Sequence, residues 1–338
     1  MFYTVESFCK SILGISYSKV FSQINKDLYR HFYIPKKNGK RKINCLEKGS
    51  SLAILQNKLL ENYLVEQPLP VCVKGFKKGE SYNSFLSEHI GARFYLRVDI
   101  KSFFDSITEN TIKKELENII ICEADKEKTK IIDLITNIAT LNGCLPQGAC
   151  TSPMLSNIVM ERIDQRINKY CQLFHVRYTR YADDMLFSSL SFDFEHRKWF
   201  LKKIKFILET IGLKLNYSKI KYGRTEMSLN GYVINEQGIR LSRKKLSDIR
   251  HIIAYINRNG HMIKNGQEVK FLQDLNNIKN AHKNIKWEQF SSIYQLAQYL
   301  CGYRAFLISI LSNDVSPSFE KETKDMICKI EKLLCKML

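Results

Sequence analysis

The chain has 338 residues, 44% of them hydrophobic and 26% charged, which excludes a disordered protein and suits one large or two ordinary domains. Its net charge of +19 excludes a basic partner and favours a polyanion, most simply nucleic acid. Residues 1–16 lack the basic start of a secretory signal, no apolar run is long enough to span a membrane, and the ten cysteines form no C-x-x-C pair. The sequence therefore predicts a cytoplasmic protein with free thiols, no zinc site and no membrane partner.

The first part of the chain is predicted to consist of helices around one hairpin. Apolar spacing favours helices over residues 1–30 and 48–66. Between them, the turn signal Asn38-Gly39 predicts a hairpin over residues 31–46. A basic loop bracketed by glycines follows at residues 75–79.

The middle of the chain mixes strands with helices, and the last part is helical. The expected elements of the middle are a strand over 93–100, helices over 109–122, 127–141, 152–170 and 196–212, a turn at 145–148 and a strand over 228–234. Beyond about residue 235 we expect only helices, over 241–258, 270–282, 288–310 and 318–336. This change of pattern marks the best candidate for a domain boundary.

Two adjacent carboxylates stand between strand-like runs in Tyr181-Ala182-Asp183-Asp184. A turn that concentrates negative charge is costly unless a cation shares it, and carboxylates with substrate phosphates are typical ligands of Mg²⁺. Asp99 is a candidate third carboxylate, because an acid in an apolar strand is expensive unless it is paired or metal-bound. If Asp99 lies beside the turn, it and Asp183 can bridge two Mg²⁺ ions, with the carbonyl of Ile100 as a further ligand. The alternatives are a solvated turn and an edge-strand aspartate that faces water.

Basic residues gather on both sides of these acids in the sequence. Residues 201–245 hold eleven Lys or Arg against three Glu, and residues 33–42 hold five Lys or Arg and no acid. A solvated helix face could explain one such run. Two of them predict a basic groove around an anionic site.

The order of several motifs resembles the reverse transcriptase family, in its bacterial branch, over about residues 30–235. The matching stretches are Ile34-Pro-Lys-Lys-Asn-Gly-Lys-Arg-Lys-Ile43, Gly75-Phe-Lys-Lys-Gly79, Asp99 with Phe103-Phe104, Leu145-Pro-Gln-Gly-Ala-Cys-Thr-Ser-Pro153, Tyr181-Ala-Asp-Asp184, Gly212-Leu-Lys-Leu-Asn-Tyr-Ser-Lys219 and Leu229-Asn-Gly231. The combination of Pro-Gln-Gly with Tyr-Ala-Asp-Asp and a suitably spaced Asp99 is specific.

The resemblance implies an α+β fold of the right-hand polymerase type, with fingers, palm and thumb. The palm would be ferredoxin-like, as in RNA-recognition (RRM) domains, and the thumb would be helical. The implied division is 1–95 fingers with N-terminal helices, 96–108 palm, 109–145 a helical insertion of fingers and palm, 146–236 palm and 237–338 thumb.

The resemblance also assigns roles at the reaction centre. Asp99, Asp183 and Asp184 would be the catalytic carboxylates and, with Ile100, would hold two Mg²⁺ ions, for which Mn²⁺ is a substitute. Asp184 could instead position the primer terminus. Asn216 is expected to be a structural partner in the turn that precedes Lys219.

A second group of residues would bind the incoming nucleotide. Lys36, Lys37 and Arg41 would grip the triphosphate, unless they form a merely solvated basic turn. Phe104 would be a steric gate against the ribose 2′-hydroxyl, with core packing as the alternative and Phe103 as the better core candidate. Gln147 and Gly148 would face the nucleotide and the template base. Lys219 would lie near the leaving pyrophosphate, or else be an exposed lysine at a helix end.

A third group would contact template and primer. Four basic residues of the expected thumb could track a duplex backbone, the Asn-Gly turn would belong to the primer grip, and the aromatic run from Tyr299 to Ser309 is better explained as core. The expected nucleic-acid-binding residues are Gly75, Lys77, Lys78, Tyr181, Asn230, Gly231, Arg243, Lys244, Lys245 and Arg250.

Together these features predict an RNA-directed DNA polymerase that copies a dedicated small noncoding RNA, of a retron or another phage-defence type. Its partners would be the RNA template, nascent DNA, deoxynucleotides and an effector protein. Phe85-Leu-Ser-Glu-His89 and Leu229-Asn-Gly231 depart from the retron forms Asn-Ala-x-x-His and Val-Thr-Gly, so the retron subtype stays open here. A noncatalytic RNA-binding or splicing-helper protein with a polymerase fold is one alternative. A protein-primed or template-independent DNA polymerase is another.

Overall fold

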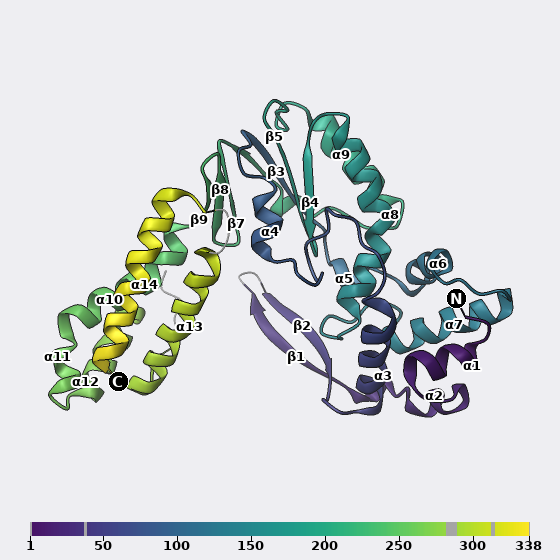
Figure 1. Ribbon diagram of the computed structural model, residues 1–338, viewed down its shortest axis with the longest axis horizontal. Helices are drawn as coiled ribbons and strands as arrows, with labels where there is room; N and C mark the ends of the chain where they lie inside the picture. Colours follow the sequence, from purple (N-terminus) through teal and green to yellow (C-terminus); the bar gives the residue numbers. More distant parts are fainter. Residues whose placement is uncertain (1, 37–38, 282–288, 312–314, 338) are drawn as a thin grey trace. The chain divides into compact units, whose positions relative to one another are not determined.

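The computed structural model describes residues 2–36, 39–281, 289–311 and 315–337 (Figure 1). The chain divides into two compact units. The first comprises residues 1–85 and 96–222, and the second comprises residues 86–95 and 223–338. Each unit is described by itself.

A four-stranded sheet forms the centre of the first unit. Its strands are β3 (Phe94–Asp99), β4 (Arg177–Tyr181), β5 (Asp184–Ser189) and β6 (Lys221–Arg224), in the spatial order β4-β5-β3-β6. Along the chain they alternate with α8 (Ser152–Gln172) and α9 (Lys198–Glu209) as β3-α8-β4-β5-α9-β6. This is the β-α-β-β-α-β arrangement of ferredoxin-like folds. The expected ferredoxin-like sheet is therefore confirmed.

The two crossover helices bury one apolar stripe each against this sheet. On α9 the buried positions are Phe200, Ile204, Ile207 and Leu208, which recur at helical spacing. Phe200 meets Phe187 of β5 edge to face, with ring centroids 5.5 Å apart. The opposite face of α9 is exposed and carries both lysines and aromatic rings, and Figure 1 shows α9 beside α8 at the margin of the sheet.

The helical character expected over residues 1–30 is confirmed up to Leu28, where four short helical segments replace one continuous helix and a strand then begins at Tyr29. The segments are α1 (Val5–Phe8), the π-helix η1 (Cys9–Leu13), α2 (Tyr17–Gln23) and the 3₁₀ turn η2 (Lys26–Leu28). Gly14 has φ of 70°, a left-handed conformation that ends the first helical run.

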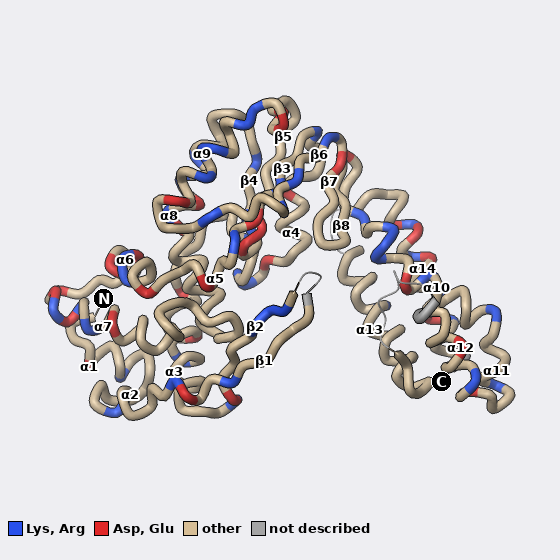
Figure 2. Tube along the Cα trace, turned by 180° about the vertical axis from the view of Figure 1, so that it is seen from behind, with Lys and Arg blue, Asp and Glu red and all other residues tan. Residues whose placement is uncertain are grey.

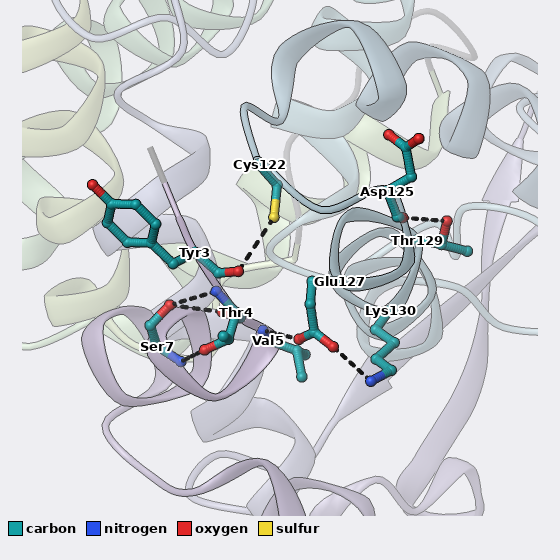
Figure 3. A network of polar contacts seen from close by, with 9 residues as sticks. All are labelled: Tyr3, Thr4, Val5, Ser7, Cys122, Asp125, Glu127, Thr129 and Lys130. Atoms are coloured by element: carbon teal, nitrogen blue, oxygen red, sulfur yellow. Dashed lines mark hydrogen bonds and ion pairs between the residues drawn. The ribbon is translucent and has the colours of Figure 1, made fainter.

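The amino terminus is fixed onto the helical insertion formed by α6 (Glu109–Ile119) and α7 (Asp125–Ala139). Glu127 accepts a hydrogen bond of 2.8 Å from the backbone N–H of Val5 and pairs with Lys130 at 2.6 Å, as Figure 3 shows. Thr4 and Ser7 cap α1 reciprocally in a capping box.

The remaining elements of the first unit flank the sheet. The hairpin of β1 (Tyr29–Lys36) and β2 (Gly39–Leu46) pairs Ile34 with Arg41, which confirms the expected hairpin. The other segments are α3 (Ser51–Leu59), the π-helix η3 (Leu60–Leu64), α4 (Tyr82–Ser87, which ends in the second unit), α5 (Phe103–Ser106) and the 3₁₀ turn η4 (Tyr217–Lys219).

The second unit begins with a three-stranded antiparallel meander of β7 (Glu226–Leu229), β8 (Tyr232–Asn235) and β9 (Gly238–Leu241). The expected single strand over 228–234 is wrong, because Asn230 and Gly231 have φ of 46° and 88° and form the tight turn between two strands. β9 also lies in the part expected to be only helical. Its Ile239 and Leu241 are buried against the meander, so tertiary packing sets the strand.

The described helices of the second unit follow the meander along the chain. They are α10 (Arg243–Asn259), α11 (His261–Lys264), α12 (Glu268–Ala281), α13 (Ile293–Leu311) and α14 (Pro317–Met337). In the described ranges of the chain, none of the helices has the length and apolar character required to cross a membrane.

Candidate active site

The three predicted carboxylates come together where β3 ends and β4 turns into β5. Asp99 is the last residue of β3, and the following N–H, of Ile100, donates a 3.0 Å hydrogen bond to the carbonyl of Asp183. Asp184 opens β5, the strand next to β3. The sequence prediction that Asp99 lies beside the acidic turn is correct.

The turn itself holds a residue in a left-handed conformation. Tyr181 pairs with Asp184 across the hairpin, and Ala182 between them has φ of 55°. An alanine is uncommon there, because its Cβ crowds the backbone. The carbonyl of Ala182 accepts a 3.1 Å hydrogen bond from the guanidinium of Arg180.

Arg180 belongs to a fully buried ion pair that the sequence analysis missed. Its guanidinium donates to both carboxylate oxygens of Asp164 on α8, at 2.7–3.0 Å, and both side chains are inaccessible to solvent. The hydroxyl of Tyr178 donates to the same carboxylate at 2.7 Å. An acid among the buried apolar residues of a helix needs a buried partner. The position of Asp164 between Ile163 and Ile167 was therefore a sequence signal that a buried ion pair exists here. The pair ties α8 to the acidic turn.

Asp99 is buried, and two polar side chains contact its carboxylate. Asn216 donates to Oδ1 at 3.0 Å, and the Lys219 ammonium lies 2.7 Å from Oδ2. The backbone N–H of Asn216 also donates to the Asp99 carbonyl at 2.8 Å. Asn216 is therefore the local structural partner that the sequence predicted. Lys219 lies at the end of η4 and is 51% exposed, directly on a predicted metal ligand.

Asp184 contacts a cation that was not predicted. Arg97 of β3 donates from Nε and Nη2 to Oδ1 of Asp184, at 2.9 and 2.6 Å, and both side chains are largely buried. Arg97 stands two residues before Asp99, so both project from the same face of the strand. An arginine in an otherwise apolar strand was the signal for this pair.

Asp183 has the most perturbed ionisation of the three acids. Burial, followed by the negative charges of Asp184 and Asp99, raises the pKa of Asp183 from 3.8 to about 6. Within the described residues it has no ion-pair partner of its own. A hard divalent cation would relieve this charge, and carboxylate oxygens together with a strand-end carbonyl are the donors it prefers.

The chemistry of the site therefore fits a divalent metal ion. As arranged here, no three His, Cys, Asp or Glu side chains of the described residues converge on one metal position. Asp99 instead contacts Lys219, and Asp184 contacts Arg97. These two side-chain cations balance the carboxylate charge that a metal ion would otherwise balance.

The basic glycine-bracketed loop packs directly against the acidic turn. A Cβ on Gly75 would lie 2.6 Å from the backbone nitrogen of Ala182, so only glycine permits this approach. Asn157 of α8 donates to the Gly75 carbonyl at 2.9 Å. Beyond Gly75, Lys77 is half-buried and Lys78 is exposed.

The Pro-Gln-Gly turn packs against the hairpin of β1 and β2. The carbonyl of Gln147 accepts a 2.8 Å hydrogen bond from the N–H of Asn44. Gly148 has φ of 122°, and a Cβ there would lie 2.6 Å from the Asn44 carbonyl oxygen. Arg41 on the same hairpin is exposed. Lys37 lies outside the described residues, as does the side chain of Lys36.

Aromatic rings surround the remaining side of the turn. Phe104 is half-buried, 5.4 Å from the ring of Phe103 and 6.3 Å from that of Phe76. Phe103 is buried, as expected of the core residue of the two. Tyr181 is half-buried, with the Tyr82 ring 5.2 Å away.

In the second unit, the predicted nucleic-acid contacts differ in exposure. Arg243 and Lys244 are exposed, and Arg250 forms an ion pair with Glu322 of α14. Lys245 is half-buried, with its ammonium 4.2 Å from the ring centroid of Tyr232 and 4.5 Å from that of Phe306. Its stem also lies against Gly231, where a Cβ would meet the Lys245 Cδ at 2.7 Å. Packing explains Lys245 without a nucleic acid.

Comparison with known proteins identifies relatives of the chain. Residues 34–272 match the family model described as reverse transcriptase (RNA-dependent DNA polymerase). The retron Ec86 reverse transcriptase of Escherichia coli is 30% identical over 234 residues, 68% of this chain and 70% of that protein. The retron Mx162 reverse transcriptase of Myxococcus xanthus is 26% identical over 254 residues, 67% of this chain and 52% of that protein. The structure of a Candida albicans telomerase in complex with a telomeric RNA fragment aligns with a TM-score of 0.46 at 12% identity, over 95% of this chain and 65% of that chain.

Proposed function

The chain belongs to the reverse transcriptase family and is an RNA-directed DNA polymerase of the bacterial retron type, and from this premise we propose that it copies a dedicated small noncoding RNA into DNA by a two-metal mechanism. The observation that carries the proposal is the meeting of Asp99, Asp183 and Asp184 at one strand end, where Asp183 has no ion pair with any described residue and its pKa is raised to about 6. Such a site is built to hold cations and phosphates.

The carboxylates divide their roles according to their contacts. We assign the two metal ions to Asp99, Asp183 and the carbonyl of Ile100. When bound, Mg²⁺ or Mn²⁺ ions would activate the primer hydroxyl and neutralise the phosphates. Asp184 is held by the largely buried Arg97, so we assign it to positioning the primer terminus. Lys219 stands at the edge of the site, where it can stabilise or protonate the leaving pyrophosphate.

Nucleotide recognition is proposed for the surrounding loops. Arg41, with Lys36 and Lys37, would bind the triphosphate, because guanidinium and ammonium groups suit phosphate oxygens. Gln147 and Gly148 would face the nucleotide and template base. Phe104 is half-buried beside the acidic turn, which suits a ring that closes on the ribose 2′ position.

Template and primer contacts follow the same scheme. In the first unit we propose Gly75, Lys77, Lys78 and Tyr181, and in the second Asn230, Gly231, Arg243, Lys244 and Arg250. We retain fingers, palm and thumb as the proposed division of the chain, at the boundaries that the sequence predicts. A role in phage defence, an effector protein and a cytoplasmic site of action are proposed from the retron type of the relatives.

Primer extension tests the function directly. The unaltered chain, Asp183→Asn and the matched surface control Asp125→Asn are supplied with a generic RNA template, DNA primer, Mg²⁺ and four deoxynucleotides, and also with RNA co-purified from the native host. Asp183→Asn should abolish synthesis while RNA affinity stays within about two-fold, because it removes a metal ligand and leaves the basic surfaces unchanged.

The control Asp125→Asn should extend normally. Product only with co-purified RNA would establish a dedicated template. Extension that survives Asp183→Asn would refute the assignment of Asp183 as a metal ligand of the reaction. Silence of the unaltered chain with every RNA and metal would refute the polymerase and leave a noncatalytic RNA-binding protein.

A further inference from the structure

The outer face of α9 carries exposed rings and lysines that the polymerase site does not use. Trp199 and Phe206 lie seven residues apart, about two helical turns, and are 46% and 56% exposed. Lys198, Lys202 and Lys203 are exposed on the same helix. Single exposed apolar residues are ordinary, but two large rings among lysines on one helix face indicate a contact surface.

A half-buried ring and a buried ring beneath Trp199 hold its indole in place. The rings of Phe174 and Phe192 lie 5.0 and 5.6 Å from it, both at steep angles, and Phe192 packs in turn on the fully buried Phe200. A ring fixed in this way loses little freedom when a planar ligand stacks on it.

The positive charge of the same face of α9 indicates that its ligand is anionic. The helix holds four lysines and one glutamate, Glu209, which pairs with Lys205 at 3.6 Å. In the described part of the chain, Lys198, Lys202 and Lys203 have no acidic partner, and the ammonium of Lys203 lies 5.1 Å from the ring centroid of Phe206. Figure 2 shows Lys and Arg positions in blue along α9.

The combination of rings and ammonium groups points to a polyanion with exposed planar groups. An apolar protein surface would bury the ammonium groups unpaired, which is costly. A duplex would offer phosphates but hide its base faces, whereas a single strand offers both. We propose that the outer face of α9, defined by Lys198, Trp199, Lys202, Lys203 and Phe206, docks a single-stranded segment of RNA outside the polymerase site. The proposal goes beyond the proposed function and rests on it only in taking RNA as the polyanion.

The test uses the full chain with its polymerase site filled by a saturating short RNA–DNA primer–template. A fluorescent fifteen-nucleotide oligouridine that carries 4-thiouridine is the probe, and no deoxynucleotides are added. Irradiation should crosslink the probe to the peptide that contains Trp199 or Phe206. Trp199→Ala should weaken probe binding about ten-fold, the loss of one stacked base. Lys202→Gln/Lys203→Gln should make the slope of log affinity against log salt shallower by about 1.4, since each single-strand phosphate contact contributes about 0.7.

Matched changes elsewhere in the first unit serve as controls. Tyr3→Ala removes another exposed ring, and Lys114→Gln/Lys126→Gln removes two exposed lysines from α6 and α7. These variants should bind the probe with unchanged affinity and salt slope. Crosslinks only outside α9, or an affinity of Trp199→Ala within two-fold of the unaltered chain, would overturn the proposal. Self-association that Trp199→Ala abolishes would overturn it in favour of a second copy of the chain.

The binding test and the polymerase test can fail separately. The crosslink needs no synthesis and can be measured on Asp183→Asn. If the unaltered chain forms the α9 crosslink but extends no primer with any RNA, the polymerase is refuted and the docking face is retained. Normal primer extension without an α9 crosslink would retain the polymerase and refute the docking face.

Discussion

Replacement of Asp183 by Asn is expected to stabilise the fold while it destroys the site. Burial and two neighbouring carboxylates raise the pKa of Asp183 from 3.8 to about 6. A carboxyl group whose pKa is raised on folding binds its proton more tightly in the folded state, so its ionisation costs stability above pH 6. This rise in pKa corresponds to a loss of about 3 kcal/mol at pH 7.5 without metal. Asparagine carries no charge and avoids this cost.

The assay is urea unfolding of both chains in EDTA at several pH values, followed by a signal from the first unit. The stability advantage of Asp183→Asn should be about 2–3 kcal/mol at pH 7.5, should decline as pH falls below 6, and should vanish near pH 3, where folded and unfolded carboxyl groups are both largely protonated. Saturating Mg²⁺ should reduce the advantage, because only the unaltered chain gains binding energy from the ion. A variant that is equally or less stable at pH 7.5, or a difference that ignores pH, would refute the electrostatic account of the site.

Two further predictions concern the fall of the primer-extension rate at low pH and the discrimination between deoxyribonucleotides and ribonucleotides. With sub-saturating Mg²⁺, primer extension should fall about ten-fold per pH unit below the pKa of Asp183 of about 6, because the protonated acid no longer holds a cation, and more Mg²⁺ should move the limb to lower pH. A rate that stays flat from pH 7.5 to 5 would contradict this. Phe104→Ala should reduce discrimination against ribonucleotides at least about ten-fold in competing single-nucleotide incorporations, since a ring-sized space opens beside the turn. If discrimination is unchanged, Phe104 is only a packing residue.

Local sequence chemistry was enough to predict the acidic turn, whereas the ferredoxin-like sheet was implied by the family resemblance and its strand β6 was not among the expected strands. Asp99 and Asp183 can be recognised from the sequence because they are acids in or beside apolar strands. The βαββαβ order of the chain determines which strands become neighbours in the sheet. The cations that meet these acids depend on cross-strand register. Arg97 faces Asp184 only because β3 and β5 are adjacent, and no short-range pattern encodes that distance.

Turn chemistry explains the expectations that failed. The expected strand over 228–234 contained the signal against it, because Asn-Gly favours a two-residue hairpin turn over a strand interior. Within the helical stretch expected over 1–30, Gly14 is a typical helix end and separates the first two helical runs. The buried pair of Arg180 and Asp164 was missed for a different reason, since a charged residue in a helix is usually solvent-exposed. The apolar neighbours of Asp164 signal its burial, but its partner on β4 follows only from the packing of α8 on that strand.

The two cations at the site differ in how easily a metal ion can displace them. Arg97 is largely buried and donates twice to Asp184, so its removal would leave a buried charge without a partner. Lys219 is half-exposed, and exposed pairs contribute only about 0–1 kcal/mol. Lys219→Met should therefore tighten Mn²⁺ binding to the free chain by at most about five-fold, as measured by electron paramagnetic resonance, since Asp99 becomes available. The same variant should lose about a hundred-fold in kcat if the ammonium acts on the leaving pyrophosphate. Tighter Mn²⁺ binding with an unchanged kcat would show that Lys219 only neutralises Asp99, and a fall in both would make it part of the metal site.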